Sequence, residues 1–500
     1  MPVLTDLVEQ LPDATLAVRD DATHDPADVI VTDMSHDSRL ATPGTLFVAL
    51  VGSSSDGHDH VAEAVANGAV AALVARPVDV AVPQVVVADT RRAAGPVAAL
   101  VHGTPSRDLR VIGTTGTNGK TTISWMVEAA AAAAGHGTGM IGTVATRING
   151  TEEPAVRTTP EGSDLQRLLA TMRDRGAEVV AMEVSSHGLE LHRVDGTHFR
   201  VAVFTNLSQD HLDFHETLED YFLAKARLFT PAFTDRAVIG VFDDWGRRLA
   251  AMTDVEHVTI GEDDDADIRL VPVAADITGS RGRLEGPEAW LGGRHDVELS
   301  TPLQGHFNLR NAAQAWVASV ALGLDPDAVT AGIAAADDVP GRVQVVVADE
   351  VTALVDYAHS PDAIDALVAA LRPLTTGRII LVLGAGGDRD RAKRGPMGAA
   401  ATAADVALFT SDNPRSEDPD AIIRELIDGA TGAGNVHGRT HMEAIPDREA
   451  AIARGLAMAV PGDVVAVLGK GHETGQEVGG IVRPFDDREV LARLWAGRSR

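Results

Sequence analysis

Short apolar runs alternate with amphipathic stretches along most of the chain, and this pattern predicts strands alternating with helices. Near the N-terminus the pattern predicts strands at 45–51, 70–75 and 83–88, and a helix at 60–68. Towards the C-terminus it predicts strands at 351–356, 378–384, 405–410 and 463–468, and helices at 361–371, 391–404, 419–429 and 447–459. The less regular, acidic segment 233–300 predicts β-hairpins and loops. Alternating strands and helices are typical of α/β domains with mainly parallel sheets.

A phosphate-binding loop is predicted within RVIGTTGTNGKTTISWMVE, residues 110–128. An apolar strand leads into a Gly- and Thr-rich turn, and a helical pattern follows. Backbone N–H groups of such a turn, with the positive end of the helix dipole, bind anionic oxygens. Lys120 would reach the terminal phosphates of ATP, and Thr121 would offer its hydroxyl to Mg²⁺. Thr114 stands where the phosphate-loop consensus G-x-x-x-x-G-K-[ST] has its first glycine, so only the second half of that consensus matches. An ATP site is still favoured over a Gly-rich turn that ends in Gly-Lys-Thr by chance.

Breaks in the pattern divide the chain, which is too long for one hydrophobic core. They are HGTPSRD at 102–108 and VPGR at 339–342. We therefore predict an α/β protein with three domains. These are a small N-terminal domain at 1–105, a central P-loop ATPase-like domain with a parallel sheet at 106–338, and a Rossmann-like domain at 339–500.

Composition narrows the class of protein. The chain has 45% hydrophobic and 23% charged residues, so it is globular, and it has no cysteine, which excludes thiol chemistry. A formal charge of −29 argues against a nucleic-acid partner. The N-terminus lacks the pattern of a secretory signal, and no apolar run approaches the roughly 20 residues of a membrane span. We expect a cytoplasmic monomer that binds neither nucleic acid nor a membrane.

Polar clusters follow the predicted strands of the central domain, where α/β enzymes place their sites. Glu183 ends one strand and is a natural Mg²⁺ ligand, although a capping role is the alternative. His211 and His215 have i, i+4 spacing, but no third ligand at a recognisable spacing supports zinc. Lys225 lies among apolar residues of a predicted helix. It either extends its amine to solvent or is buried with a lowered pKa, in which case it can react with carbon dioxide.

Several motifs, taken together, resemble the Mur ligases, the ATP-dependent ligases that build the stem peptide of peptidoglycan. They follow in order over nearly the whole chain: DSR and PGTLFVA near the start, TGTNGKTT, EVSSHGL, N-L-x-x-D-H-L-D-x-H, AKARLF, GHFNLRNAAQA, PGR, DYAHSPDAI, GGDRDRAKR, DNPRSEDP and GKGHE. The resemblance is greatest to the members that add the third amino acid to UDP-N-acetylmuramoyl-L-alanyl-D-glutamate. By contrast, GAGGDRD at 384–390 lacks the third glycine of a dinucleotide-binding motif.

The resemblance implies a role for each matching position. For ATP it implies Gly116, Thr117, Asn118, Gly119, Lys120, Thr121, Thr122, His306, Asn308, Asn311, Arg342 and Asp356. For two Mg²⁺ ions it implies Thr121, Glu183, His211 and Lys225, the last carbamylated to N6-carboxylysine. For catalysis it implies Lys120, Glu183, His211 and Lys225, and His359 is a candidate proton handler or phosphate contact. The sequence assigns no general base.

The resemblance also implies the substrate contacts. The UDP-sugar dipeptide would contact Ser38, Ser53, Ser54, Ser55, Thr158, Thr159, Ser185 and Arg193. The amino acid would contact Arg394, Asp412, Asn413, Pro414, Arg415, Gly469 and Glu473. The DNPR motif is similar to that of members that add meso-diaminopimelate. Its arginine can bind the distal carboxylate of that amino acid bidentately, whereas lysine has no such carboxylate.

The predicted function is therefore an ATP-dependent amide ligase of peptidoglycan precursor synthesis that acts through an acyl phosphate. Two alternatives are the same ligase adding L-lysine, and a non-catalytic nucleotide-binding partner of cell-wall synthesis. The complete set of Lys120, Glu183, His211 and Lys225 argues against the second. A folate-polyglutamate-type ligase shares part of the phosphate loop but lacks DNPR and GKGHE.

Overall fold

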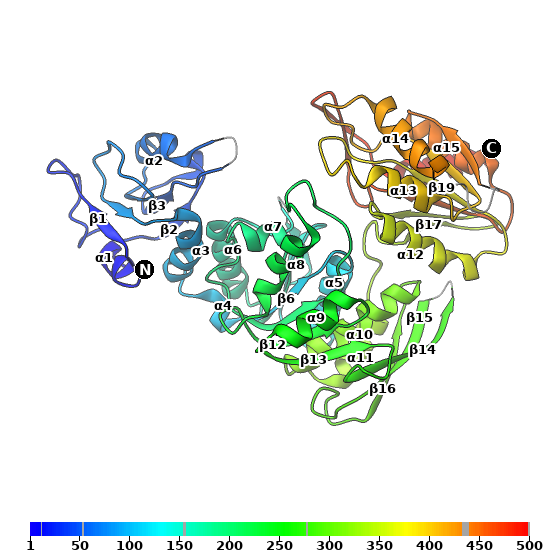
Figure 1. Ribbon diagram of the computed structural model, residues 1–500. Helices are drawn as coiled ribbons and strands as arrows, with labels where there is room; N and C mark the ends of the chain where they lie inside the picture. Colours follow the sequence, from blue (N-terminus) through cyan, green and yellow to red (C-terminus); the bar gives the residue numbers. More distant parts are fainter. Residues whose placement is uncertain (12, 53–54, 154–156, 277–278, 433–439, 499–500) are drawn as a thin grey trace.

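The computed structural model describes residues 1–500 except 12, 53–54, 154–156, 277–278, 433–439 and 499–500. An N-terminal, a central and a C-terminal body follow one another along the chain, each around its own sheet (Figure 1). The N-terminal body (blue) and the C-terminal body (yellow to red) lie on either side of the central one. In the described part of the chain no helix is long and apolar enough to cross a membrane.

The N-terminal sheet has the strand order β1-β5-β4-β3-β2. Its strands are parallel except β1, which pairs antiparallel with β5. The strands are β1 (Thr15–Ala17), β2 (Asp33–Ser35), β3 (Thr45–Val48), β4 (Ala71–Val74) and β5 (Gln84–Val86), and the helices α1 (Leu4–Glu9), α2 (Val61–Ala66) and α3 (Thr90–Val101). β3 and β4 are buried along their whole length, as their apolar runs predict.

The central sheet has the order β16-β15-β14-β13-β12-β11-β6-β10-β7-β8-β9. Strands from β14 to β7 in this order are parallel, and antiparallel hairpins extend both edges. Apolar clusters fill both faces, one of them around the fully buried Trp316. The strands are β6 (Arg110–Thr115), β7 (Thr138–Ile141), β8 (Thr146–Ile148), β9 (Thr151–Glu153), β10 (Val179–Glu183), β11 (Phe199–Phe204), β12 (Thr234–Gly240), β13 (Glu256–Gly261), β14 (Ile268–Asp276), β15 (Gly279–Glu285) and β16 (Asp296–Thr301). The helices are α4 (Pro105–Asp108), α5 (Lys120–Ala133), α6 (Gly162–Asp174), α7 (Ser186–Glu190), α8 (Leu218–Ala226), α9 (Asp244–Met252), α10 (His306–Ala321) and α11 (Pro326–Ala334).

The C-terminal sheet has the order β17-β18-β22-β19-β20-β21 and is parallel except for β17. Its strands are β17 (Gln344–Ala348), β18 (Thr352–Asp356), β19 (Ile379–Leu383), β20 (Val406–Phe409), β21 (His441–Ala444) and β22 (Val464–Leu468). Its helices are α12 (Pro361–Leu371), α13 (Arg394–Ala401), α14 (Pro419–Gly432), α15 (Arg448–Met458) and α16 (Asp487–Arg498). A separate hairpin, β23 (Gly475–Val478) with β24 (Ile481–Pro484), follows β22.

The prediction for segment 233–300 is wrong in its first half. Residues 234–261 form β12, α9 and β13, which continue the parallel sheet, and the predicted hairpins begin only at β14. The pattern misleads here because β13 is an alternating strand whose exposed positions are polar, as in a hairpin. The predicted C-terminal pattern is confirmed, although β17, β21, the β23–β24 hairpin and α16 were not predicted.

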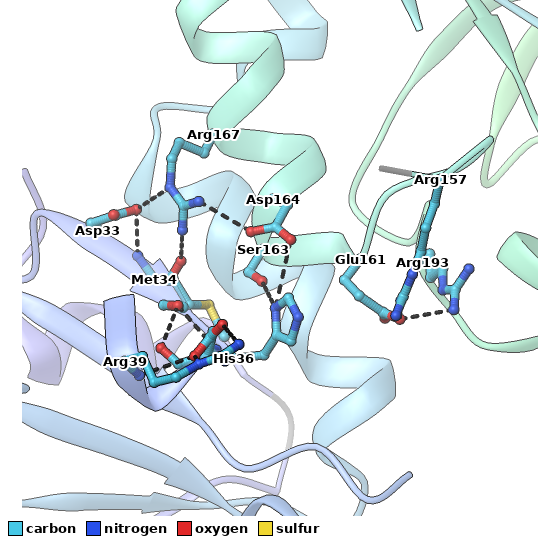
Figure 2. Close-up of polar contacts among 12 residues, drawn as sticks. Asp33, Met34, His36, Arg39, Arg157, Glu161, Ser163, Asp164, Arg167 and Arg193 are labelled. Atoms are coloured by element: carbon cyan, nitrogen blue, oxygen red, sulfur yellow. Dashed lines mark hydrogen bonds and ion pairs between the residues drawn. The ribbon is translucent and has the colours of Figure 1, made fainter. Parts of the chain in front are cut away.

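The N-terminal and central bodies pack closely where α3 meets α6. Arg167 of α6 donates to Asp33 Oδ1 at 2.9 Å and to the Met34 carbonyl, as Figure 2 shows. On the same face, His36 Nδ1 lies 3.2 Å from Ser163 Oγ. A Cβ at Gly95 of α3 would lie 1.9 Å from the Asp195 carbonyl oxygen. Only glycine allows this approach of the two backbones, so the contact fixes one body against the other.

Candidate active site

The predicted phosphate loop connects β6 to α5. Gly116 and Gly119 have φ of 145° and 89°, and a Cβ at Gly116 would lie 1.8 Å from Thr205 Oγ1. Lys120 folds over the loop and donates to the carbonyls of Gly116 and Thr117 at 2.9 and 2.8 Å. No side chain caps the start of α5. Its first N–H groups therefore point into the loop, where an anionic ligand can accept from them.

The Glu183 carboxylate stands at the end of β10, beside this loop. The register pairs Glu183 with Thr114 of β6, which brings the two strand ends together. Thr143 holds the buried carboxylate with its N–H, at 2.8 Å from Oε1, and with its hydroxyl, at 2.9 Å from Oε2. These donors fix the orientation of a carboxylate that can bind a hard cation.

Lys225 is buried in α8 on the other side of the loop. Its Nζ donates to the Gly116 carbonyl at 2.9 Å and lies 4.3 Å from the centre of the Tyr221 ring. Burial lowers the pKa of Lys225 well below its usual value, and the neighbouring Lys120 adds to this effect. Both effects favour the neutral, nucleophilic form of the amine, and because the side chain is buried, the alternative of a solvent-directed lysine is wrong.

His211 and His215 lie in a ring cluster with His187. The ring centre of His187 is 4.9 Å from that of His211 and 5.8 Å from that of His215. His211 has a φ of 56°, which is uncommon for a residue other than glycine and marks a constrained turn. Among the described residues no group of His, Asp and Glu side chains is arranged to hold a metal ion by itself.

Residues of the central and C-terminal bodies meet at Asp210. Its carboxylate lies 3.3 Å from Lys393 Nζ and 3.5 Å from His359 Nε2. Burial alone would raise the pKa of Asp210, but the bond from His359 and the nearby cations hold it well below its usual value. His359 also contacts the Tyr357 carbonyl, at 2.8 Å from Nδ1. The predicted proton handler thus stands at the junction of the two bodies.

The predicted nucleotide contacts surround a cavity of about 570 Å³ between the same bodies. Asn308 and Asn311 line it from α10, and Asn311 Nδ2 donates to Asn308 Oδ1 at 3.1 Å, whereas His306 pairs with Glu262 at 3.0 Å. From the C-terminal body, Arg342 donates to Thr121 Oγ1 at 3.3 Å. The predicted residues that line this cavity are Thr117, Asn118, Gly119, Lys120, Thr121, Thr122, Thr158, Glu183, Ser185, His211, Lys225, Asn308, Asn311, Arg342, Asp356 and His359.

Asp356 has a structural task at the cavity wall. Its carboxylate accepts the N–H groups of Val343 and Ala358, both at 2.7 Å. Burial raises the pKa of Asp356, although Arg342 opposes the rise. Asp356 therefore holds the segment that carries Arg342 against the start of the loop after β18.

The predicted dipeptide contacts lie towards the N-terminal body. Thr158 bonds Thr143 between hydroxyls at 2.9 Å, and Thr159 donates to the Glu183 carbonyl at 3.0 Å. Ser185 donates to Thr159 at 3.1 Å. In the N-terminal body, Ser38 donates to Glu63, Ser55 lies 3.3 Å from a ring nitrogen of His60, and Ser53 and Ser54 lie outside the described residues.

Glu161 gathers arginine side chains beside these residues. Arg193 and Arg157 reach its carboxylate, Arg193 at 2.8 Å, and Figure 2 shows them converging on it. Arg91 of the N-terminal body contacts the same carboxylate at 3.5 Å. A single carboxylate leaves these guanidinium groups with excess positive charge, which suits an anionic substrate.

The DNPR motif follows β20, next to the loops after β19 and β22. Arg415 donates to the Gly387 carbonyl at 2.6 Å and approaches Glu477 to 3.7 Å, and its side chain remains 25% exposed. Asn413 donates to Glu473 at 2.7 Å. The fully buried Lys470 donates to the same Glu473 oxygen at 3.1 Å. A positive and a negative group, Arg415 and Glu473, are thus held at the carboxyl ends of the strands of this sheet.

Arg394, a predicted contact of the amino acid, is buried in an ion-pair cluster. Its guanidinium is buried and donates to both oxygens of Glu417, at 2.9 and 2.7 Å, and to Glu425 at 3.1 Å. It also donates to the Gly386 carbonyl at 3.1 Å. These partners neutralise Arg394 and tie it to the loop after β19, and its contact with the amino acid stays a prediction.

Some functional positions were not predicted from the sequence. Thr143, Glu161, Tyr221 and Lys470 contact predicted site residues through their side chains. Thr143 could have been found, because it comes two residues after the end of β7, at the same end of the sheet as Glu183. The others carry no local signal.

Comparison with known proteins places the chain in a family. Residues 31–110 match the Mur ligase family catalytic domain, 114–319 the Mur ligase middle domain, and 341–471 the Mur ligase glutamate ligase domain. The chain belongs to the Mur ligase family. It is therefore an ATP-dependent ligase, and the predicted three-domain α/β architecture is confirmed.

This Mur ligase is similar over most of its length to proteins named as diaminopimelate-adding ligases. It is 48% identical over 472 residues to the UDP-N-acetylmuramoyl-L-alanyl-D-glutamate–2,6-diaminopimelate ligase of Streptomyces coelicolor, with 92% of each chain covered. A solved structure of a ligase of that name is 31% identical, has a TM-score of 0.67, and covers 96% of this chain and 97% of its own. The MurF ligase of Thermotoga maritima in complex with ADP shares the fold, at 19% identity and a TM-score of 0.65, covering 94% and 98%.

A prediction about Thr143 follows from its two bonds to Glu183. Thr143→Val keeps the shape but removes the hydroxyl donor, so the carboxylate loses one of its supports. We expect activity to fall by about 10- to 100-fold, with a higher Mg²⁺ concentration needed for half-maximal rate. Magnesium titrations of the ligase rate measure this. The matched Thr171→Val change, on α6 away from the site, should leave both unchanged, and an unaltered Mg²⁺ requirement in Thr143→Val would contradict the assigned role.

Proposed function

We propose that the protein joins meso-diaminopimelate to the γ-carboxylate of the D-glutamate of UDP-N-acetylmuramoyl-L-alanyl-D-glutamate, with cleavage of ATP to ADP and phosphate. The observation that carries this proposal is the placement of Arg415 and Glu473 on loops at the carboxyl ends of two strands, β20 and β22, of one sheet. An arginine fork binds the distal carboxylate, and the glutamate pairs with the ammonium beside it. The names of the relatives support the same amino acid.

ATP is proposed to bind with its phosphates on the loop before α5. The uncapped N–H groups of that helix donate to the β- and γ-phosphate oxygens, and Lys120 exchanges its bonds to the Gly116 and Thr117 carbonyls for the γ-phosphate. The base and ribose lie towards Asn308 and Asn311 in the cavity between the bodies. This placement rests on the lining of the cavity and on the family.

The residues present fit two Mg²⁺ ions once a carbamate is added. Protein Mg²⁺ sites use one or two carboxylates with phosphates and water, and Glu183 is a carboxylate held in a fixed orientation. The buried amine of Lys225 can add carbon dioxide when it is neutral: its nitrogen bonds to the carbon, one proton leaves the nitrogen, and the product is a second carboxylate, with His211 and Thr121 near by. When bound, the ions neutralise charge that develops on the transferred phosphoryl group.

The chain then acts on two successive steps. In the first, the γ-carboxylate oxygen bonds to the γ-phosphorus of ATP, the bond to the ADP oxygen breaks, and Lys120 balances the charge. In the second, the neutral amine of diaminopimelate attacks the acyl carbon, the bond to phosphate breaks, and a proton leaves the nitrogen. His359 stands where it can take part in that proton transfer, held by Asp210.

The test is phosphate release from ATP and Mg²⁺ with the UDP-muramoyl dipeptide and diaminopimelate, with lysine, or with neither amino acid. We expect turnover only with diaminopimelate. Turnover with lysine would keep the reaction but overturn the amino-acid pocket. No phosphate release in any of the three reactions would favour a non-catalytic nucleotide-binding protein. We also propose that the protein is a cytoplasmic monomer, and a dimer in sedimentation at assay concentration would contradict the monomer.

A further inference from the structure

Arg448 is a fully buried cation that no step of the reaction uses. It is the first residue of α15, and its side chain has no exposed surface. Its guanidinium forms a bidentate pair with the equally buried Asp487, the first residue of α16, at 2.8 and 2.7 Å. A cation at the start of a helix opposes the helix dipole, so α15 itself gives no reason for an arginine here.

The remaining donors of Arg448 join two loops of the amino-acid pocket. Nη1 donates to the Ser411 carbonyl at 3.2 Å, and Nη2 donates to the Leu468 carbonyl at 2.9 Å. Ser411 immediately precedes the DNPR motif after β20, and Leu468 ends β22, immediately before Gly469. Strand β19 separates β20 from β22 in the sheet, so no backbone ladder connects these two strand ends. Arg448 is therefore a direct polar bridge between them.

The joined loops pack with little freedom. A Cβ at Gly469 would lie 2.4 Å from Asp412 Oδ2, and one at Gly387 would lie 1.9 Å from the Pro414 carbonyl oxygen. The Gly387 N–H donates to the Asn413 carbonyl at 2.9 Å. A small shift of either strand end would therefore change the separation of Arg415 and Glu473. These two residues are proposed to bind the distal carboxylate of diaminopimelate and the ammonium beside it.

We infer that Arg448, fixed by Asp487, is a positioning residue that sets the geometry of the amino-acid pocket. The identity of the substrate in this inference rests on the proposed function, whereas the contacts of Arg448 are independent of it. The bridge acts on the DNPR loop and on the Gly469–Glu473 loop together, while the phosphate loop lies in another body of the molecule. Its loss should therefore weaken use of the amino acid more than use of ATP or of the UDP-sugar dipeptide.

The decisive variant replaces the pair by apolar side chains, Arg448→Met with Asp487→Leu, in the full-length protein. Exchange of a buried ion pair for apolar residues of similar size is often neutral for stability, whereas removal of one partner strands a buried charge. We expect a folded variant whose KM for diaminopimelate rises about tenfold or more, with KM for ATP and for the dipeptide substrate changed less than about threefold. Arg454→Met, which removes an exposed arginine of α15 paired with Glu443, is the matched control.

Hydrogen exchange gives a second readout that needs no substrate. The amides of Gly387, Glu477 and Gly469 donate to Asn413 or Asp356 around these loops, so they should exchange about tenfold faster in the double variant and at the wild-type rate in Arg454→Met. Should the wild type fail to use diaminopimelate, the proposed function fails, and exchange still decides whether the bridge positions the loops.

Unchanged KM values and unchanged exchange in a folded double variant would overturn the inference. An equal change in all KM values would do so as well, because a merely structural pair would act in that way. If the double variant does not fold, Arg448→Lys decides. It keeps the charge beside Asp487 but lacks the fork that spans both carbonyls, and a wild-type KM for diaminopimelate would then refute the role.

Discussion

Lys225→Met should lower the ligase rate by about a thousandfold while the protein stays folded. The wild-type amine is buried and its pKa is depressed, so it is poised to become the carbamate proposed to complete the Mg²⁺ site. Methionine keeps the volume but cannot form a carbamate. Folding should survive because the Gly116 carbonyl, which accepts from Lys225, also accepts from Lys120. Steady-state phosphate release and thermal unfolding measure the two effects.

A carbon-13 spectrum separates the carbamate from a simple role of the amine. Wild-type protein in ¹³C-labelled bicarbonate should show a carbamate carbon that is absent from Lys225→Met. Lys120→Met, which removes the lysine that follows the phosphate loop, should retain that signal although it also loses activity. Full activity of Lys225→Met would contradict the carbamate role, and so would a ¹³C carbamate signal in the spectrum of that variant.

Arg415→Ala should lower kcat/KM for diaminopimelate by about a hundredfold, the scale of a lost charged, bidentate hydrogen bond. Of the two arginines predicted to contact the amino acid, Arg415 is the one whose side chain stays partly exposed. It donates to the Gly387 carbonyl, and its contact with Glu477 is long, at 3.7 Å. Arg415→Lys should recover little of the loss because lysine offers a point charge and no fork. Initial rates at varied diaminopimelate measure this.

Arg424→Ala provides the matched control for that loss. Arg424 is exposed on α14 and pairs with Asp418 at the surface, so kcat/KM should stay at the wild-type value. Unchanged diaminopimelate use by Arg415→Ala would count against the pocket. A gain of lysine use by the same variant would indicate that the arginine also excludes lysine, by repulsion of its terminal ammonium.

The phosphate loop and the strand ends around it were predictable because their signals are local. A Gly-rich turn before Lys120 defines a helix start, and an apolar run before Glu183 places that carboxylate at a strand end. The order of the motifs then gave the family. Such features depend on neighbours within a few residues, so the sequence encodes them directly.

The two arginines of the predicted pocket illustrate the opposite case. Arg394 and Arg415 both occur in family motifs, yet only Arg415 keeps a partly exposed guanidinium, whereas Glu417 and Glu425 occupy Arg394. Burial and ion pairing between distant segments give the two guanidinium groups different surroundings. No periodicity or spacing along the chain reports which carboxylate will face which guanidinium.

Strand order decided what the linear pattern left open. It brought Thr143 to the carboxylate of Glu183, continued the parallel sheet through β13, and separated Ser411 from Leu468 by β19 so that Arg448 can bridge them. The sequence by itself determined the elements, the phosphate loop and the family, because these follow from local periodicity and motif order. Only the tertiary structure decided which polar groups support the site, because those partners lie far apart in the chain and meet through packing.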